Sequence, residues 1–158
     1  MHFVKWIGVL VIAAFAFLGG IWLSAFEQAR CRQARAFLAL LEYMRRQIEC
    51  FSLPVPQILQ EADASLLAAC GVEERPRDFA SLLQDCELLL PARYCTLLAE
   101  FSAELGTAYR SEQLRACTYY TAQLTPLCEE IERELQRRSS LWRLLPGAVG
   151  AALILMLI

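Results

Sequence analysis

The chain has 158 residues, of which 57% belong to the hydrophobic set and 20% are charged, and its formal net charge is −2. This composition excludes a plain soluble globule and a disordered chain, and because no basic block occurs we expect no nucleic-acid partner. The single histidine, His2, lies in the N-terminal arm, so the commonest general acid or base is missing from the rest of the chain and no enzymatic activity is predicted.

The N-terminal part of the chain is strongly apolar. Residues 6–26 carry no charge, and a helix over them rises about 31 Å, close to the hydrocarbon thickness of a bilayer. We therefore predict a transmembrane helix over residues 1–26, surrounded by membrane lipid. A cleaved signal peptide is the alternative for this run. Gly20 lies on a face of small residues spaced four apart, which is typical of helices that pack closely in membranes.

A helix is predicted to continue from this run into the following residues. Apolar residues recur there at alternating intervals of four and three, which forms a heptad seam of Phe37, Leu41, Met44, Ile48 and Phe51. The helix should end before Pro54 and Pro56, because proline lacks an amide donor and disfavours helix in the residue before it. Both prolines are candidate structural or interaction residues, since they fix the chain reversal.

Three shorter helices are predicted next. The first covers residues 56–70 and ends at Gly71, the second starts at Pro76, and the third starts at Pro91. Gly106 follows the third as a natural C-terminal cap and is a further candidate structural or interaction residue.

The last helix of the domain begins with Ser111 as the candidate N-cap. It carries a second seam and includes Gln113 as another candidate structural or interaction residue. The seam consists of Leu114, Cys117, Thr121, Leu124, Cys128, Ile131 and Leu135. We expect the two seam helices to pair antiparallel as a stalk, with the three short helices forming a distal cap.

The C-terminus is a second apolar run. Counted from Leu141, it gives a helix of about 27 Å, so we predict a second transmembrane helix over residues 141–158. Gly147 lies on a small-residue face like that of Gly20. These faces predict packing of the two spans or a homo-oligomer, and the alternative is that they only reflect the high frequency of small residues in membrane helices. The predicted fold is thus all-α: two transmembrane helices flank an antiparallel helical bundle of about five helices over residues 27–140.

Charges and cysteines indicate where the domain lies. Nearly all cations that flank the predicted spans stand on the domain side, so the positive-inside rule makes the domain cytoplasmic. The seven cysteines follow no disulfide-like spacing, which agrees with a reducing compartment. Residues 27–48 have a net charge of +3 and residues 49–112 of −7. The positive-inside bias together with solvated helix faces is one explanation of this difference, and an acidic surface offered to a basic partner is the other.

Motifs for catalysis, cofactors and metals are not found in the sequence. The glycines are scattered and no HExxH, GxSxG or CxxC motif occurs, so neither a cofactor nor a metal ion is expected. Three cysteines occupy apolar helical positions, and we predict them to be buried as small hydrophobic side chains: Cys86, Cys117 and Cys128.

Three stretches resemble one protein family. QIECFSLPVPQIL at residues 47–59, LGTAYRSEQ at residues 105–113 and the ending WRLLPGAVGAALILMLI are similar to stage III sporulation protein AB. The matching positions are Ile48, Pro54, Pro56, Leu59, Leu105, Gly106 and Gln113.

This resemblance implies a function that composition and spacing do not. It implies a non-enzymatic membrane platform in the secretion-like channel complex of endospore formation, located in the outer forespore membrane on the mother-cell side. The implied partners are a cytoplasmic secretion-type ATPase, stage III sporulation protein AA, and other membrane proteins of that complex. The alternative is a membrane-anchored helical sensor or scaffold of another pathway.

Overall fold

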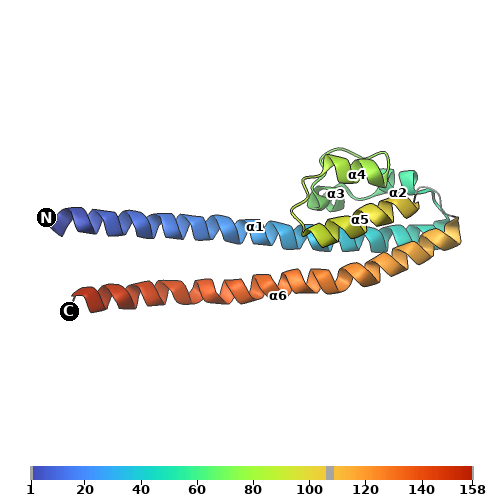
Figure 1. Cartoon of the computed structure of the whole chain (residues 1–158). Coiled ribbons are helices and arrows are strands. Elements are labelled where there is room, and N and C mark those ends of the chain that lie inside the picture. The colour runs from blue at the N-terminus through green and yellow to red at the C-terminus, as the bar shows by residue number, and fades with distance from the viewer. Residues whose placement is uncertain (1, 106–108, 158) are drawn as a thin grey trace. The chain divides into compact units, whose positions relative to one another are not determined.

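The computed structural model describes the backbone of residues 2–105 and 109–157, and the side chains of residues 18–19, 21–105 and 109–138 (Figure 1). Its described residues contain only helices and loops, which confirms the all-α prediction. The helices are α1 (His2–Phe51), α2 (Val55–Glu61), α3 (Ala64–Cys70), α4 (Phe79–Asp85), α5 (Ala92–Leu105) and α6 (Arg110–Leu157).

The long first helix ends where the sequence predicts. α1 stops at Phe51, Ser52 adopts a left-handed backbone with φ 54°, and Pro54 becomes the N-cap residue of α2 with φ −69° and ψ 144°. Pro56 occupies the second position of α2, where its missing amide hydrogen costs no helical hydrogen bond. The two prolines therefore end one helix and start the next.

The short helices differ in part from the prediction. Residues 56–70 form two helices rather than one, because Ala62 is extended and the Asp63 side chain starts α3 by accepting a hydrogen bond from Ser65 N. Gly71 ends α3 in the left-handed region with φ 99°, as predicted.

The starts of the next helices are set by side chains near their first turns. α4 starts at Phe79 and not at Pro76, because Asp78 and Ser81 form a capping box. α5 follows Pro91 directly, as predicted. α6 starts one residue before Ser111, whose predicted role as N-cap is wrong, and Glu112 accepts a hydrogen bond from Tyr109 N there. Gly106, the predicted cap of α5, lies outside the described residues.

The chain divides into two compact units, residues 30–132 and residues 1–29 with 133–158. In the first unit, α1 and α6 run antiparallel. Arg110 near the start of α6 donates hydrogen bonds to Ile48 O and Glu49 O at the end of α1, at 3.1 and 2.7 Å. At the opposite end of the pair, Arg35 Nε lies 2.5 Å from Glu132 Oε1.

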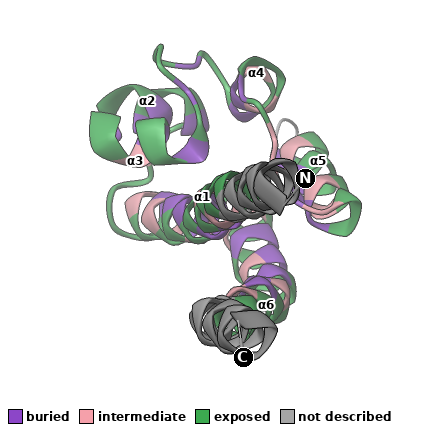
Figure 2. Cartoon of the chain, turned by 90° about the vertical axis from the view of Figure 1, so that its left-hand side faces the viewer, coloured by how far each residue is buried: buried purple, intermediate pink, exposed green. Residues whose placement is uncertain are grey.

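The core of the unit of residues 30–132 is built from the two predicted seams and the short helices, as the burial colours of Figure 2 show. Phe37, Leu41, Met44 and Ile48 of the first seam are buried, whereas Phe51 is 68% exposed. Most of the second seam is also buried: Cys117, Leu124, Cys128 and Ile131.

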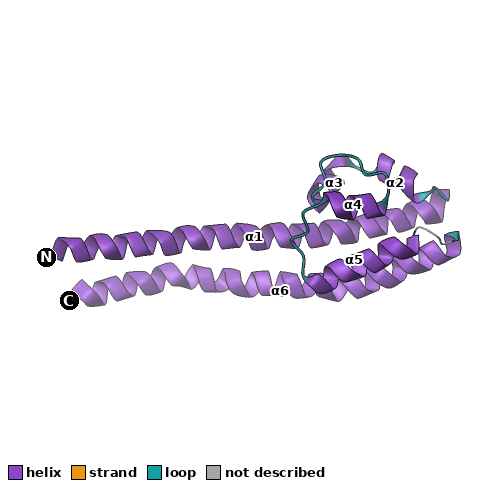
Figure 3. Cartoon of the chain, turned by 45° about the horizontal axis from the view of Figure 1, so that its top comes forward, coloured by secondary structure: helices purple, strands orange, loops and turns teal. Residues whose placement is uncertain are grey.

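The short helices do not form a distal cap. They lie alongside α1 in Figure 1 and Figure 3, and Gln33, near the start of this unit, contacts both the end of α3 and the segment after α4. The Tyr94 hydroxyl of α5 donates a hydrogen bond to Ala34 O at 2.9 Å, which brings α5 to the same part of α1. The distal-cap prediction is wrong because these buried polar contacts fold the short helices back along α1.

The predicted transmembrane helices require a correction. Among the described residues, no helix combines the length and the apolar character needed to cross a membrane. This finding contradicts the two transmembrane helices predicted over residues 1–26 and 141–158.

Candidate docking groove

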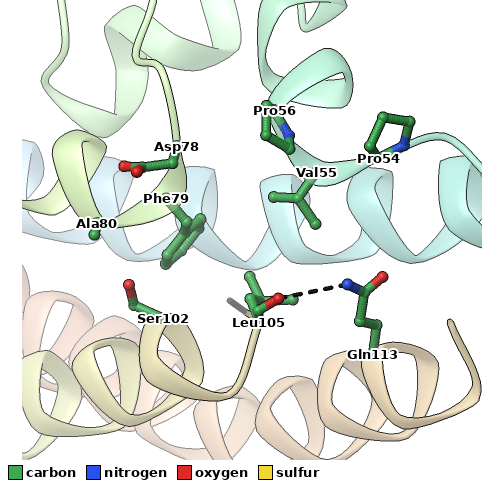
Figure 4. A pocket seen from close by; sticks show the side chains of 9 residues that line it. All are labelled: Pro54, Val55, Pro56, Asp78, Phe79, Ala80, Ser102, Leu105 and Gln113. Atoms are coloured by element: carbon green, nitrogen blue, oxygen red, sulfur yellow. Dashed lines mark hydrogen bonds between the residues drawn. The ribbon is translucent and has the colours of Figure 1, made fainter. Parts of the chain in front are cut away.

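Three of the predicted candidate residues meet at one cavity in the unit of residues 30–132. Pro54 and Pro56 at the start of α2 and Gln113 in the first turn of α6 line a groove of about 400 Å³ (Figure 4). The sequence places the prolines almost sixty residues from Gln113, so only the fold brings them together. Gly106 lies outside the described residues, and Gly20 and Gly147 lie outside those whose side chains are described.

The walls of the groove are apolar and firmly packed. Val55, Phe79 and Leu105 line it and are 8%, 2% and 6% exposed. The Phe79 ring packs edge-on against Phe101 with ring centroids 5.0 Å apart, and Phe101 contacts Tyr120 at 5.5 Å. Because these side chains are held by the core, the groove is formed before anything binds to it.

Polar atoms at the groove are mainly hydrogen-bond acceptors. Asp78 Oδ1 accepts a hydrogen bond from Ser81 N at 2.7 Å, and this bond lowers the pKa of the Asp78 carboxyl, so it is ionised at neutral pH. Gln113 Nε2 donates to Leu105 O at 3.4 Å, which turns the amide oxygen of Gln113 away from that carbonyl (Figure 4). None of the described lining residues is a cation. The groove thus suits an apolar group that carries hydrogen-bond donors or positive charge.

The surface around the groove is acidic. Residues 49–112 contain eleven carboxylates and four arginines, and all eleven carboxylate residues are exposed. In the part of the chain that the structure describes, only Glu49 of the eleven forms an ion pair, with Arg45 at 3.6 Å. Their charge is therefore directed mostly at solvent.

A second cavity lies between α1 and α6 and has about 310 Å³. Its charged groups are already engaged, since Arg35 pairs with Glu132 and the Cys128 thiol lies 3.8 Å from the same carboxylate oxygen. The described residues contain no group of three or more His, Cys, Asp or Glu side chains placed to hold a metal ion. Cys86, Cys117 and Cys128 are buried, as predicted.

Sequence reasoning missed several residues of the groove. Phe79 and Leu105 fall within the helices predicted to start at Pro76 and Pro91, but nothing in the sequence related them to Pro54 and Pro56. Asp78 and Ser102 were not singled out. The aspartate had a recognisable signal, because an Asp three residues before Ser at the start of a helix is a capping pattern. The side chain of Ser102 carried no such signal.

A family model described as stage III sporulation protein AB matches residues 5–72 and residues 72–158. No curated protein and no solved structure matches the chain. The two matched segments together cover nearly all of the sequence, including every residue that lines the groove.

Proposed function

This chain belongs to the stage III sporulation protein AB family, and from that membership we propose that it is a non-enzymatic scaffold of the secretion-like sporulation channel complex. The family gives the chain a role in sporulation. In the proposed role, the helical domain docks the cytoplasmic ATPase, stage III sporulation protein AA, and supports assembly with other proteins of the complex.

The acidic surface is the observation that carries the proposal. Eleven exposed carboxylates against four arginines in residues 49–112 attract a basic surface. Unlike carboxylates in a surface network of ion pairs, ten of them have no cationic side chain as a partner among the described residues. Complementary charge speeds association and selects the partner, which is what a docking platform needs.

The supporting structure is rigid where docking requires it. The segment of short helices and connecting loops that bears most of these carboxylates is held to α1 by Gln33 and Tyr94 through hydrogen bonds of 2.8–2.9 Å. A platform with few internal degrees of freedom loses little conformational entropy when it binds, which favours affinity.

Binding of the purified ATPase to the full chain tests the proposal. Glu73 and Glu74 are exposed in the loop between α3 and α4, and the E73K/E74K double variant reverses two charges there. We expect the dissociation constant to rise about tenfold at 50 mM salt and to depend less steeply on salt. The matched control is E130K/E134K, which makes the same charge change on exposed residues of α6.

The affinities of the two variants distinguish specific docking from an unspecific charge effect. Loss of affinity in E73K/E74K with normal affinity in E130K/E134K supports docking through the acidic surface. No binding of the ATPase at any salt concentration overturns the proposal, and an equal loss in both variants reduces it to an unspecific charge effect.

A further inference from the structure

We propose that the groove lined by Pro54, Phe79, Leu105 and Gln113 is the anchor point for the docked ATPase. The occupant is a segment of that ATPase in which a large apolar side chain stands next to lysine or arginine. This inference rests on the proposed function and names the part of the surface that provides affinity beyond long-range charge.

The large apolar side chain of the proposed occupant is inferred from the apolar walls of the groove. A cavity of about 400 Å³ next to the buried side chains of Val55, Phe79 and Leu105 leaves apolar surface that a partner can cover. Interfaces draw most of their binding energy from a few large side chains that fill such preformed pockets. Pro54 and Pro56 add rigid walls without amide donors, so the start of α2 loses little freedom when the groove is filled.

The lysine or arginine of the proposed occupant is inferred from the polar residues at the rim of the groove, Asp78, Ser102 and Gln113. The carboxylate of Asp78, the hydroxyl of Ser102 and the amide oxygen of Gln113 can all accept hydrogen bonds, and no described lining residue is a lysine or arginine. The hydrogen bond from Ser81 N keeps the Asp78 carboxylate in place as well as ionised. A guanidinium or ammonium group beside the apolar anchor would meet fixed acceptors here.

The charge of this chain argues against a second copy as the occupant. Another copy would bring its own net charge of −7 over residues 49–112 to an acidic rim. A basic segment of a different protein meets no such repulsion.

Ala80 allows the groove to be tested with little disturbance of the fold. It lines the groove at the second position of α4, and it is exposed. A80F fills the groove without a change of charge, A80K brings a cation to the rim, and A80E adds an anion. The matched controls are A68F and A68K on α3, since Ala68 is also exposed and helical but does not line the groove.

The experiment measures the affinity of the full chain for the full-length ATPase at 50 and 500 mM salt. We expect A80F to weaken binding about tenfold at both concentrations, because apolar contacts are not screened by salt. A80K should weaken binding about tenfold at 50 mM, whereas A80E, A68F and A68K should stay within about twofold of the unchanged chain. Thermal unfolding of each variant confirms that the fold is kept, and A80E serves as the substitution that α4 tolerates best, since an acidic side chain suits a helix N-terminus.

Four outcomes of the binding measurements would overturn the inference, each for a different reason. If A80F and A80K bind normally while E73K/E74K does not, docking uses charge alone and the groove is not the anchor. If A80E weakens binding and A80K strengthens it, the occupant is acidic and the inference is overturned. If the unchanged chain does not bind the ATPase, the proposed function fails and this inference fails with it. If A80K weakens self-association of the chain but not ATPase binding, the occupant is a second copy and the inference is wrong.

Discussion

Gln33 and Gly71 lie directly against each other in the helical domain. A Cβ atom at Gly71 would lie 3.1 Å from Gln33 Nε2, and the same nitrogen donates a hydrogen bond to the neighbouring Cys70 O at 2.9 Å. Gly71 also has φ 99°, which side-chain-bearing residues rarely adopt. The glycine thus allows the close approach that the glutamine requires.

Replacement of Gly71 by alanine should destabilise the chain by about 1.5 kcal/mol, because it adds left-handed strain and crowds a fixed amide. Urea unfolding measures the change. The control is G19A in α1, where a Cβ would meet nothing within 4 Å, and this variant should lose no stability. A coupling near zero between G71A and Q33A in a double-mutant cycle would contradict the proposed contact, since contacting residues normally couple by more than about 0.5 kcal/mol.

Replacement of Gln33 by leucine should cost about 3 kcal/mol of unfolding free energy. Gln33 is 4% exposed, and its amide serves three backbone groups at 2.8–2.9 Å: Cys70 O, Glu87 O and Leu89 N. Leucine can pair with none of them, so Cys70 O stays buried, and Glu87 O and Leu89 N part-buried, without this partner. The exposed Gln57, whose amide donates a hydrogen bond to Glu61, provides the comparison, and Q57A should change stability by less than about 0.5 kcal/mol. An equal, small effect of both substitutions would show that water reaches the Gln33 site.

Local features of the fold could be predicted from the sequence. The end of α1 at Phe51, the end of α3 at Gly71 and the start of α5 after Pro91 depend on prolines and glycines within a few residues. The break between α2 and α3 depends on the weaker signal of Asp63 as an N-cap, and it was missed.

Long-range features could not be predicted in the same way. Gln33 holds the short helices along α1 by hydrogen bonds to partners that lie between 37 and 56 positions further along the chain. No periodicity in the sequence indicates these bonds. The groove has the same origin, since Pro54, Phe79 and Gln113 come from separate helices. The predicted spans relied on apolar length alone, and no helix of the described residues meets the requirement for crossing a membrane.

The cysteines should differ strongly in reactivity. Burial raises the pKa of Cys70 to about 12 and the pKa values of Cys117 and Cys128 to about 11, whereas Cys50 is exposed at the end of α1. At pH 8 the thiolate fractions of the buried thiols are small, so Cys50 should react with a thiol reagent at least about 100-fold faster. Time-resolved labelling followed by mass spectrometry measures each site. C50S should remove the fast phase in the folded chain, and denaturation should make all the remaining cysteines reactive.

The ion pair of Arg35 and Glu132 should make stability depend on acid pH. The hydrogen bond from Arg35 Nε, at 2.5 Å, lowers the pKa of the Glu132 carboxyl, and the Cys31 and Cys128 thiols near it are neutral in this range. A carboxyl with a lowered pKa in the folded state contributes its stability above the unfolded pKa of about 4.3 and loses it as pH falls through the folded value.

We therefore expect E132Q to unfold at a lower temperature than the unchanged chain between pH 5 and pH 8, with a constant gap there, and the gap should close as pH falls below about 4. The gap should correspond to less than about 1 kcal/mol, because the Arg35 and Glu132 side chains are 60% and 31% exposed and solvent screens the pair. Thermal unfolding followed by circular dichroism over this pH range makes the comparison.

E49Q is the control for this prediction. It removes the carboxylate of the exposed pair with Arg45, whose atoms are 3.6 Å apart, and should show a smaller gap. A gap in E132Q that persists unchanged to pH 2 would assign the effect to side-chain packing, because protonation would then have no influence on it.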